Sequence, residues 1–197
     1  MNKTWLGLFF SALIWSAIHP KDYLTWALET APAIIAVIIL MATRRRFPLT
    51  GLAYGLILVH SIILMIGGHY TYAEVPLFDW LKEVFNLDRN NYDKVSHFAQ
   101  GLVPAIIARE IIIRNHVVKQ GNWLNFFVIC ICLAISAFYE IIEWRVAVLG
   151  KEAADAFLGT QGYLWDTQSD MAYALVGAIV ALLTLTRIHN RQISTLG

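Results

Sequence analysis

The chain has 197 residues, of which 58% are hydrophobic and 15% are charged, and its formal net charge is +1. This composition indicates an integral membrane protein, and the near-neutral charge gives no reason to expect a nucleic-acid partner. The length suits one integral membrane domain over residues 1–197 rather than two domains, with membrane lipids as its surroundings.

The apolar runs predict an all-α fold, a polytopic membrane helix bundle. About six transmembrane helices are expected, at about residues 5–18, 23–42, 49–67, 93–113, 123–149 and 166–187. The first of these segments resembles a signal peptide. Cleavage after Ala17 would place Trp15 where a small residue is required, so we expect the segment to remain as an anchor.

A long polar connection separates the third and fourth expected spans. Within it, apolar residues recur at helical spacing opposite charged ones over residues 77–85. This pattern is typical of a short helix that lies in the membrane interface. The connection is expected on the periplasmic side.

The basic residues predict this orientation, because cytoplasmic loops carry an excess of Lys and Arg close to the ends of spans. With both termini in the cytoplasm, the inner ends hold most of them: Lys3, Arg44, Arg45, Arg46, Arg109, Arg114, Lys119, Arg187 and Arg191. The outer side keeps Lys21, Lys82, Arg89, Lys94, Arg145 and Lys151. Among the acidic residues only Glu110 falls inside, and this asymmetry points to a polar site at the outer face.

Acidic residues and a histidine recur three or four positions apart near the outer ends of three spans. These pairs are Asp93 with His97, Glu140 with Glu143, and Asp166 with Asp170. Residues at these spacings share one face of a helix. Gln100 continues the face of Asp93 and His97, and Glu29 lies in the outer half of the second span. We therefore expect one polar pocket that faces the periplasm.

Carboxylates and a histidine from facing helices are how carboxylate metal sites are built in bundles. The ligands expected for a divalent metal ion are His69, Glu74, Asp93, His97, Glu140, Glu143, Asp166 and Asp170. The groups expected to carry catalysis are His97, Glu140, Glu143 and Asp170. The residues expected to contact a small-molecule or lipid substrate are Tyr70, Tyr72, Gln100 and Arg145.

Other interpretations of the same residues stay open. Asp93 and Asp166 also suit the N-terminus of a helix, where an aspartate caps free N–H groups. Glu140 and Glu143 also suit a structural pair with Arg145 or a tyrosine, and a lone His60 suits hydrogen-bonded packing. At the level of function, a metal-dependent enzyme competes with a proton-coupled transporter that uses the carboxylates as a relay. A third alternative is a non-catalytic envelope-stress or partner-binding protein.

Four separate motifs resemble the YjdF family of bacterial inner-membrane proteins. They are the stretches 69–76, 92–98, 139–144 and 165–171, and the resemblance covers nearly the whole chain. It implies a location in the bacterial inner membrane and names no activity. A partial similarity to VanZ-like membrane proteins is carried by Asp93, Lys94 and His97, and more loosely by Glu140 or Glu143 and Asp170.

Overall fold

The computed structural model describes residues 2–150 and 161–196, and every regular element in these residues is a helix. The all-α prediction is therefore confirmed. Lys151, which was counted among the outer basic residues, lies outside the described residues. The helices are α1 (Lys3–Ser16), α2 (Tyr23–Thr43), α3 (Gly51–Tyr70), α4 (Pro76–Phe85), α5 (Tyr92–Arg114), α6 (Asn122–Gly150), α8 (Asp166–Thr184) and α9 (Thr186–Ile193).

The first three helices begin at side-chain caps. The side chains of Asn2, Asp22 and Thr50 accept hydrogen bonds from the backbone N–H groups of Trp5, Thr25 and Ala53, respectively. Such bonds satisfy N–H groups that have no partner within the helix. Each cap therefore fixes the residue at which an apolar run becomes helical.

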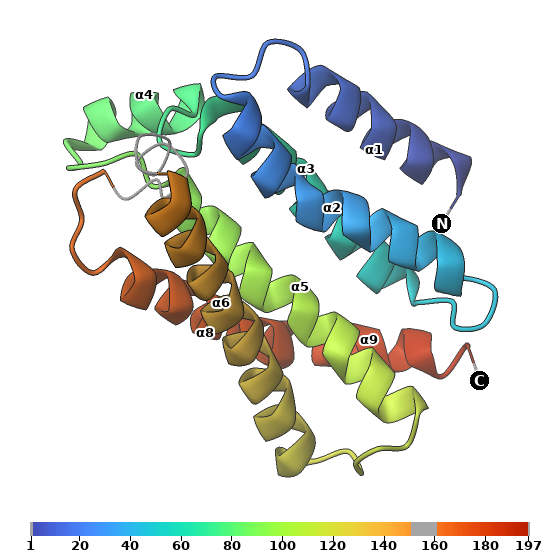
Figure 1. Ribbon diagram of the computed structural model, residues 1–197. Coiled ribbons are helices and arrows are strands. Elements are labelled where there is room, and N and C mark those ends of the chain that lie inside the picture. Colours follow the sequence, from blue (N-terminus) through green and yellow to red (C-terminus); the bar gives the residue numbers. More distant parts are fainter. Residues whose placement is uncertain (1, 151–160, 197) are drawn as a thin grey trace.

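Hydrogen bonds and ion pairs sort the helix ends into two groups. At one end, Lys21 before α2 pairs with Glu74 after α3, and Arg89 before α5 pairs with Asp166 at the start of α8. At the other end, Thr50 before α3 bonds to Glu110 near the end of α5. Figure 1 shows both chain termini at the end of the molecule that lies away from α4.

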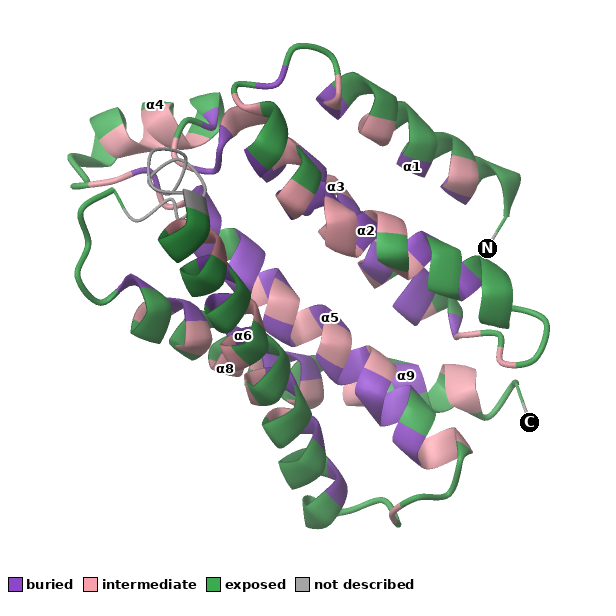
Figure 2. Ribbon diagram, in the orientation of Figure 1, coloured by how far each residue is buried: buried purple, intermediate pink, exposed green. Residues whose placement is uncertain are grey.

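Helix α5 lies at the centre of the bundle and packs against α3, α6, α8 and α9. Figure 2 shows mostly buried and intermediate residues along it, whereas α6 carries a long exposed face. Helices α5 and α8 approach each other closely because a glycine of each lies at their contact. A Cβ on Gly101 would lie 1.7 Å from the carbonyl oxygen of Ala174, and one on Gly177 would lie 2.0 Å from that of Phe98. Small residues allow helices to approach in this way in membrane proteins.

Within residues 2–150 and 161–196, four helices are long and apolar enough to cross a membrane: α2, α3, α6 and α8. Helix α1 falls short because its 14 residues span about 21 Å at 1.5 Å per residue, against a hydrocarbon core of about 30 Å. Helix α5 has 23 residues but carries charged residues near both ends. The sequence placed the end of the sixth span at Arg187. The structure corrects this, because α8 ends at Thr184 and a separate helix α9 follows.

Candidate functional site

Three aspartates from the starts of α5 and α8 surround one buried lysine. Lys94 Nζ donates to Asp166 Oδ1 and to Asp170 Oδ1, both at 2.6 Å, and lies 3.4 Å from Asp93 Oδ2. Arg89 Nη1 donates to Asp166 Oδ1 at 2.6 Å. All three aspartates are buried. The close packing of α5 on α8 at the two glycines brings their first turns to this distance.

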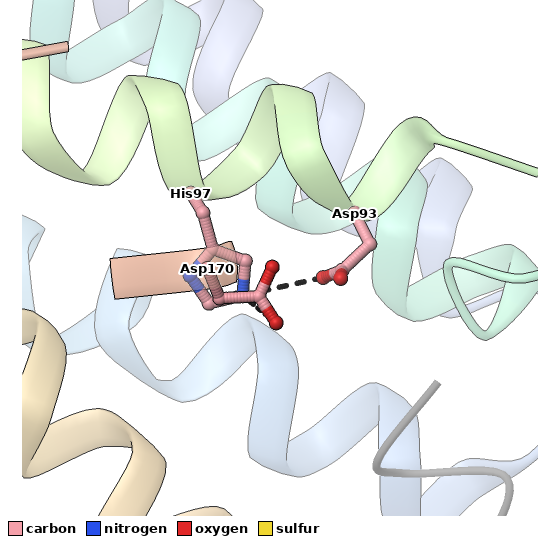
Figure 3. A group of neighbouring side chains, drawn as sticks. All are labelled: Asp93, His97 and Asp170. Carbon is pink, nitrogen blue, oxygen red and sulfur yellow. Dashed lines mark ion pairs between the residues drawn. The ribbon is translucent and has the colours of Figure 1, made fainter. Parts of the chain in front are cut away.

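His97, one turn further along α5, lies beside Asp93 and Asp170 (Figure 3). It faces the carboxylate oxygens of these two residues that lie further from Lys94. Its Nε2 is 3.3 Å from Asp93 Oδ1 and 3.9 Å from Asp170 Oδ2. Its Nδ1 lies 2.9 Å from Gln100 Oε1. An amide oxygen only accepts hydrogen bonds, so Nδ1 carries the proton of this bond. The other ring nitrogen, Nε2, faces the two carboxylates.

Glu140 and Glu143 bring a second pair of carboxylates to the same histidine from α6. One ligand atom of each, together with one of His97, lies within 4.8 Å of the others. Glu140 Oε1 is 3.9 Å from His97 Nδ1, is buried, and has no hydrogen-bond partner among the described residues. The pairing of Glu140 and Glu143 with Arg145 does not form, since Arg145 is exposed and lies over the ring of Trp144.

A cavity of about 240 Å³ extends from this cluster into the bundle. Its polar end is lined by Glu29, Tyr72, Asp93, Ser96, His97, Gln100, Tyr139 and Glu143. Its other walls are mostly apolar, and they come from α2, α3, α5 and α6: Pro32, Ala33, Ala36, Ile57, Leu64, Val103, Pro104, Ile107 and Ile135. The cavity is therefore amphipathic, with the acidic cluster at one end.

The buried polar groups at this end of the bundle hold more acidic than basic side chains. We call them the outer cluster, which consists of Glu29, Asp93, His97, Glu140, Glu143, Asp166 and Asp170 with Arg89 and Lys94. Six carboxylates face two basic side chains and one histidine. Buried negative charge without compensation is costly. A bound cation or protons on some of the carboxylates would supply the missing positive charge.

Four of the residues expected in the site lie away from it. His69 Nδ1 is 3.0 Å from the backbone oxygen of Ser16, and its ring stacks on Trp15. Tyr70 packs against the His69 ring. Glu74 pairs with Lys21 at an exposed position. Arg145 is exposed and lies over the ring of Trp144. The remaining expected residues lie in or beside the outer cluster and its cavity: Tyr72, Asp93, His97, Gln100, Glu140, Glu143, Asp166 and Asp170.

Sequence reasoning missed several residues of this site. Lys94 is not among the residues expected in the site, although its position next to Asp93 indicates charge pairing. Tyr139 donates to Glu29 Oε2 at 3.0 Å, so these two residues join α6 to α2. The sequence alone suits His60 to hydrogen-bonded packing. It lines the cavity, and its buried Nε2 has no hydrogen-bond partner among the described residues.

A second buried polar group, the inner network, lies at the opposite end of the bundle. Glu110 accepts bonds from the Thr50 hydroxyl at 2.7 Å and from Arg114 at 2.9 Å, and it lies 3.1 Å from His189 Nε2. Arg109 lies 3.1 Å from His189 Nδ1. Because arginine only donates, Nδ1 accepts and Nε2–H donates to Glu110. The network ties α9 to α3 and α5.

The fold and the outer cluster together define a class, a multi-pass membrane helix bundle with a buried carboxylate–histidine cluster at one end. A family model described as "Predicted membrane protein (DUF2238)" matches residues 1–191. Inner membrane protein YjdF of Escherichia coli (strain K12) is 52% identical over 185 residues, which cover 94% of this chain and 88% of that protein. The chain belongs to this family of inner-membrane proteins, as the four motifs predicted. No solved structure matches it.

Proposed function

We propose that the outer cluster binds a divalent metal ion and that the protein is a metal-dependent enzyme acting on a lipid or envelope-linked substrate. One observation carries the proposal. His97 stands between two pairs of carboxylates, and the pair on α6 has no Lys or Arg beside it among the described residues. A cation in this position would supply the positive charge that the cluster lacks.

The distances suit a metal centre around His97 Nε2. Nitrogen and oxygen ligands lie about 2.0–2.2 Å from zinc, so two ligands of one ion lie roughly 3–3.5 Å apart. Asp93 Oδ1 and Asp170 Oδ2 are 3.3 and 3.9 Å from Nε2, so a small adjustment would bring all three onto one ion. The Gln100 amide would fix the ring from the other side, as outer partners of metal-bound histidines do.

Glu140 and Glu143 would complete the chemistry from α6. A divalent ion activates a bound water or polarises a phosphoryl or carbonyl oxygen. The free oxygen of Glu140 lies 3.9 Å from His97 Nδ1, and it would accept a proton from such a water. The amphipathic cavity would hold the apolar part of a substrate beside the metal.

We further propose six membrane spans with both termini in the cytoplasm and the outer cluster facing the periplasm. Helix α5 would span about 35 Å at 1.5 Å per residue, which is enough to cross. Helix α1 presents Leu8, Phe10 and Ile14 outward, as a lipid-facing helix does. Helix α4 exposes Leu77, Trp80, Val84 and Phe85, and this face suits the membrane interface.

A proton-coupled carrier remains the second candidate because His60 continues the polar lining below His97. A carrier needs polar groups that reach the inner face. Between the outer cluster and the inner network the core is mostly apolar, with Ala53, Ala105, Ile106, Cys132 and Ala178 fully buried. Ser136, one turn below Glu140 on α6, is a buried polar residue on this side of the cluster. This layer favours a pocket closed toward the cytoplasm and therefore favours the enzyme.

The test is equilibrium dialysis of the purified protein in neutral detergent against Mn²⁺ or Zn²⁺, followed by metal analysis. We expect about one ion per chain, and we expect His97→Ala to lose it. The matched control is His69→Ala, which removes a histidine outside the cluster and leaves binding unchanged. No bound metal in the wild-type protein, or equal binding by His97→Ala, would refute the proposal.

A further inference from the structure

Glu29 is a buried acid that the proposed metal centre does not use. It lies in the second turn of α2 within a strongly apolar helix and is 4% exposed. Its carboxylate accepts a hydrogen bond from Tyr139, and it forms no ion pair with a described residue. Ionisable residues are costly within a membrane-spanning segment, so a buried acid at this position indicates a functional site.

Two aromatic rings flank this carboxylate at the polar end of the cavity. Tyr139 contributes its hydroxyl group from α6, and Tyr72 reaches the cavity from the turn after α3. Burial raises the pKa of the Tyr72 phenol well above its ordinary value, so the ring stays neutral. A carboxylate together with neutral aromatic rings is the chemistry that recognises organic ammonium groups.

The backbone at the end of α3 brings the side chains of Tyr72 and Glu29 close to that helix. Thr71 and Tyr72 both have left-handed backbone conformations, with φ of 57° and 55°, and this turn directs the Tyr72 ring against Gly67. A Cβ on Gly67 would lie 2.3 Å from that ring, and one on Gly68 would lie 3.2 Å from the Glu29 Cβ. The two glycines therefore permit the approach of both side chains.

The rest of the cavity determines what else the ligand carries. No Lys or Arg of the described residues lines it, so an anionic headgroup finds no partner there without a metal. Beyond its polar end the walls are mostly apolar, with His60 and Ser61 as the exceptions among the described lining residues. The volume of about 240 Å³ lies below the range of about 300–1,000 Å³ typical of pockets for drug-sized ligands. One short alkyl chain fits this space better than a two-chain lipid.

We propose that the cavity binds a lipophilic amine, with its ammonium group at Glu29 between Tyr72 and Tyr139 and its alkyl chain along the apolar walls. Pro32, Ile57, Leu64 and Ile107 contact the chain in this arrangement. The ammonium group uses Glu29, which is not one of the proposed metal ligands, although the cavity also borders Asp93, His97 and Glu143.

The experiment compares three probes with the same chain: octyltrimethylammonium, octanol and octyl phosphate. Each is titrated calorimetrically into the purified protein in a neutral maltoside detergent with EDTA, against protein-free micelles. We expect saturable binding of the ammonium probe and at least tenfold weaker binding of the other two. Equal binding of octanol and the ammonium probe would overturn the proposal, and this comparison needs no variant.

Variants then locate the ammonium group. Glu29→Gln should weaken binding of octyltrimethylammonium at least tenfold, while Glu83→Gln, which removes an exposed acid on α4, should leave it unchanged. Unaltered binding by a folded Glu29→Gln protein would overturn the assignment. Asp170→Asn, which changes a proposed metal ligand that does not line the cavity, should lose metal and keep binding of octyltrimethylammonium, so the two proposals can be refuted separately. Displacement of the probe by phosphatidylethanolamine would identify a lipid headgroup as the source of the ammonium, and lack of displacement a free amine.

Discussion

The two buried polar groups of this bundle resemble each other in composition and differ in how their charges are satisfied. In the inner network the acid is satisfied, because the fully buried Glu110 is bonded by a threonine, a histidine and an arginine, and only Arg109 Nε has no hydrogen-bond partner among the described residues. The outer cluster holds six carboxylates and two basic side chains. Glu140 Oε1 has no hydrogen-bond partner in the described part of the chain, and a cavity adjoins the cluster. A satisfied network holds a fold together, whereas an unsatisfied one beside a cavity is prepared for a ligand.

Removal of the inner acid should cause the largest loss of stability. Glu110→Ala leaves the fully buried His189 without its carboxylate partner and removes the ion pair to the half-buried Arg114. Breaking a buried ionic network in this way costs about 3–5 kcal/mol. The measurement is denaturant unfolding in detergent. Glu83→Ala is the matched control at an exposed position.

The same variant sharpens the contrast between the two groups. Metal bound per folded Glu110→Ala molecule should equal that of the wild-type protein, because the inner network holds no ligand of the proposed metal centre. A loss of stability below about 1 kcal/mol would contradict the structural role of the network.

The glycine contact between α5 and α8 should have an intermediate effect that reaches the outer cluster. Gly177→Ala pushes a Cβ into the backbone of Phe98, and overpacking of this kind costs about 1–3 kcal/mol. Because α8 must move away from α5, Asp170 moves away from His97 and metal affinity should fall as well.

Gly55→Ala is the control for this substitution, since nothing lies within 4 Å of a Cβ at that position. Unfolding and metal titration of both variants are the measurements. Metal affinity that stays constant while Gly177→Ala loses stability would separate the helix contact from the site.

The smallest effect is expected at Glu74, an acid that the sequence places among the metal ligands. Its carboxylate pairs with Lys21 at an exposed position outside the cluster. Glu74→Gln should therefore change neither metal content nor melting temperature beyond experimental error, as is usual for surface pairs. A loss of bound metal in this variant would place the metal elsewhere than at His97.

Apolar runs and helical spacing in the sequence predict most of the long helices of this structure. The predicted spans agree with α2, α3, α5 and α6 to within a few residues, because each apolar run begins and ends at charged or capping residues. The separate helix α9 could not be predicted. The bonds of His189 and Asn190 to α5 hold it in place, and these contacts join residues about 80 positions apart.

The site was predictable where one helix face decides the geometry. Asp93 with His97, Glu140 with Glu143, and Asp166 with Asp170 follow from spacing alone, and the structure places His97 beside Glu143, as that spacing implied. The neighbouring stretch 69–74 was not predictable. Two left-handed residues turn Tyr72 inward and leave His69, Tyr70 and Glu74 outside, and this reversal depends on local backbone angles that no periodicity reveals.

The central claim is that the α6 carboxylates face a cation rather than a structural network. Glu140→Gln and Glu143→Gln keep the shape of the side chain and remove its charge. Metal content and melting temperature should be measured for both variants and the wild-type protein, with and without a chelator. We predict reduced metal content in both variants, and in the chelated samples a melting temperature equal to or above that of the wild-type protein. Unchanged metal content in both variants, or no metal in any sample, would contradict the claim.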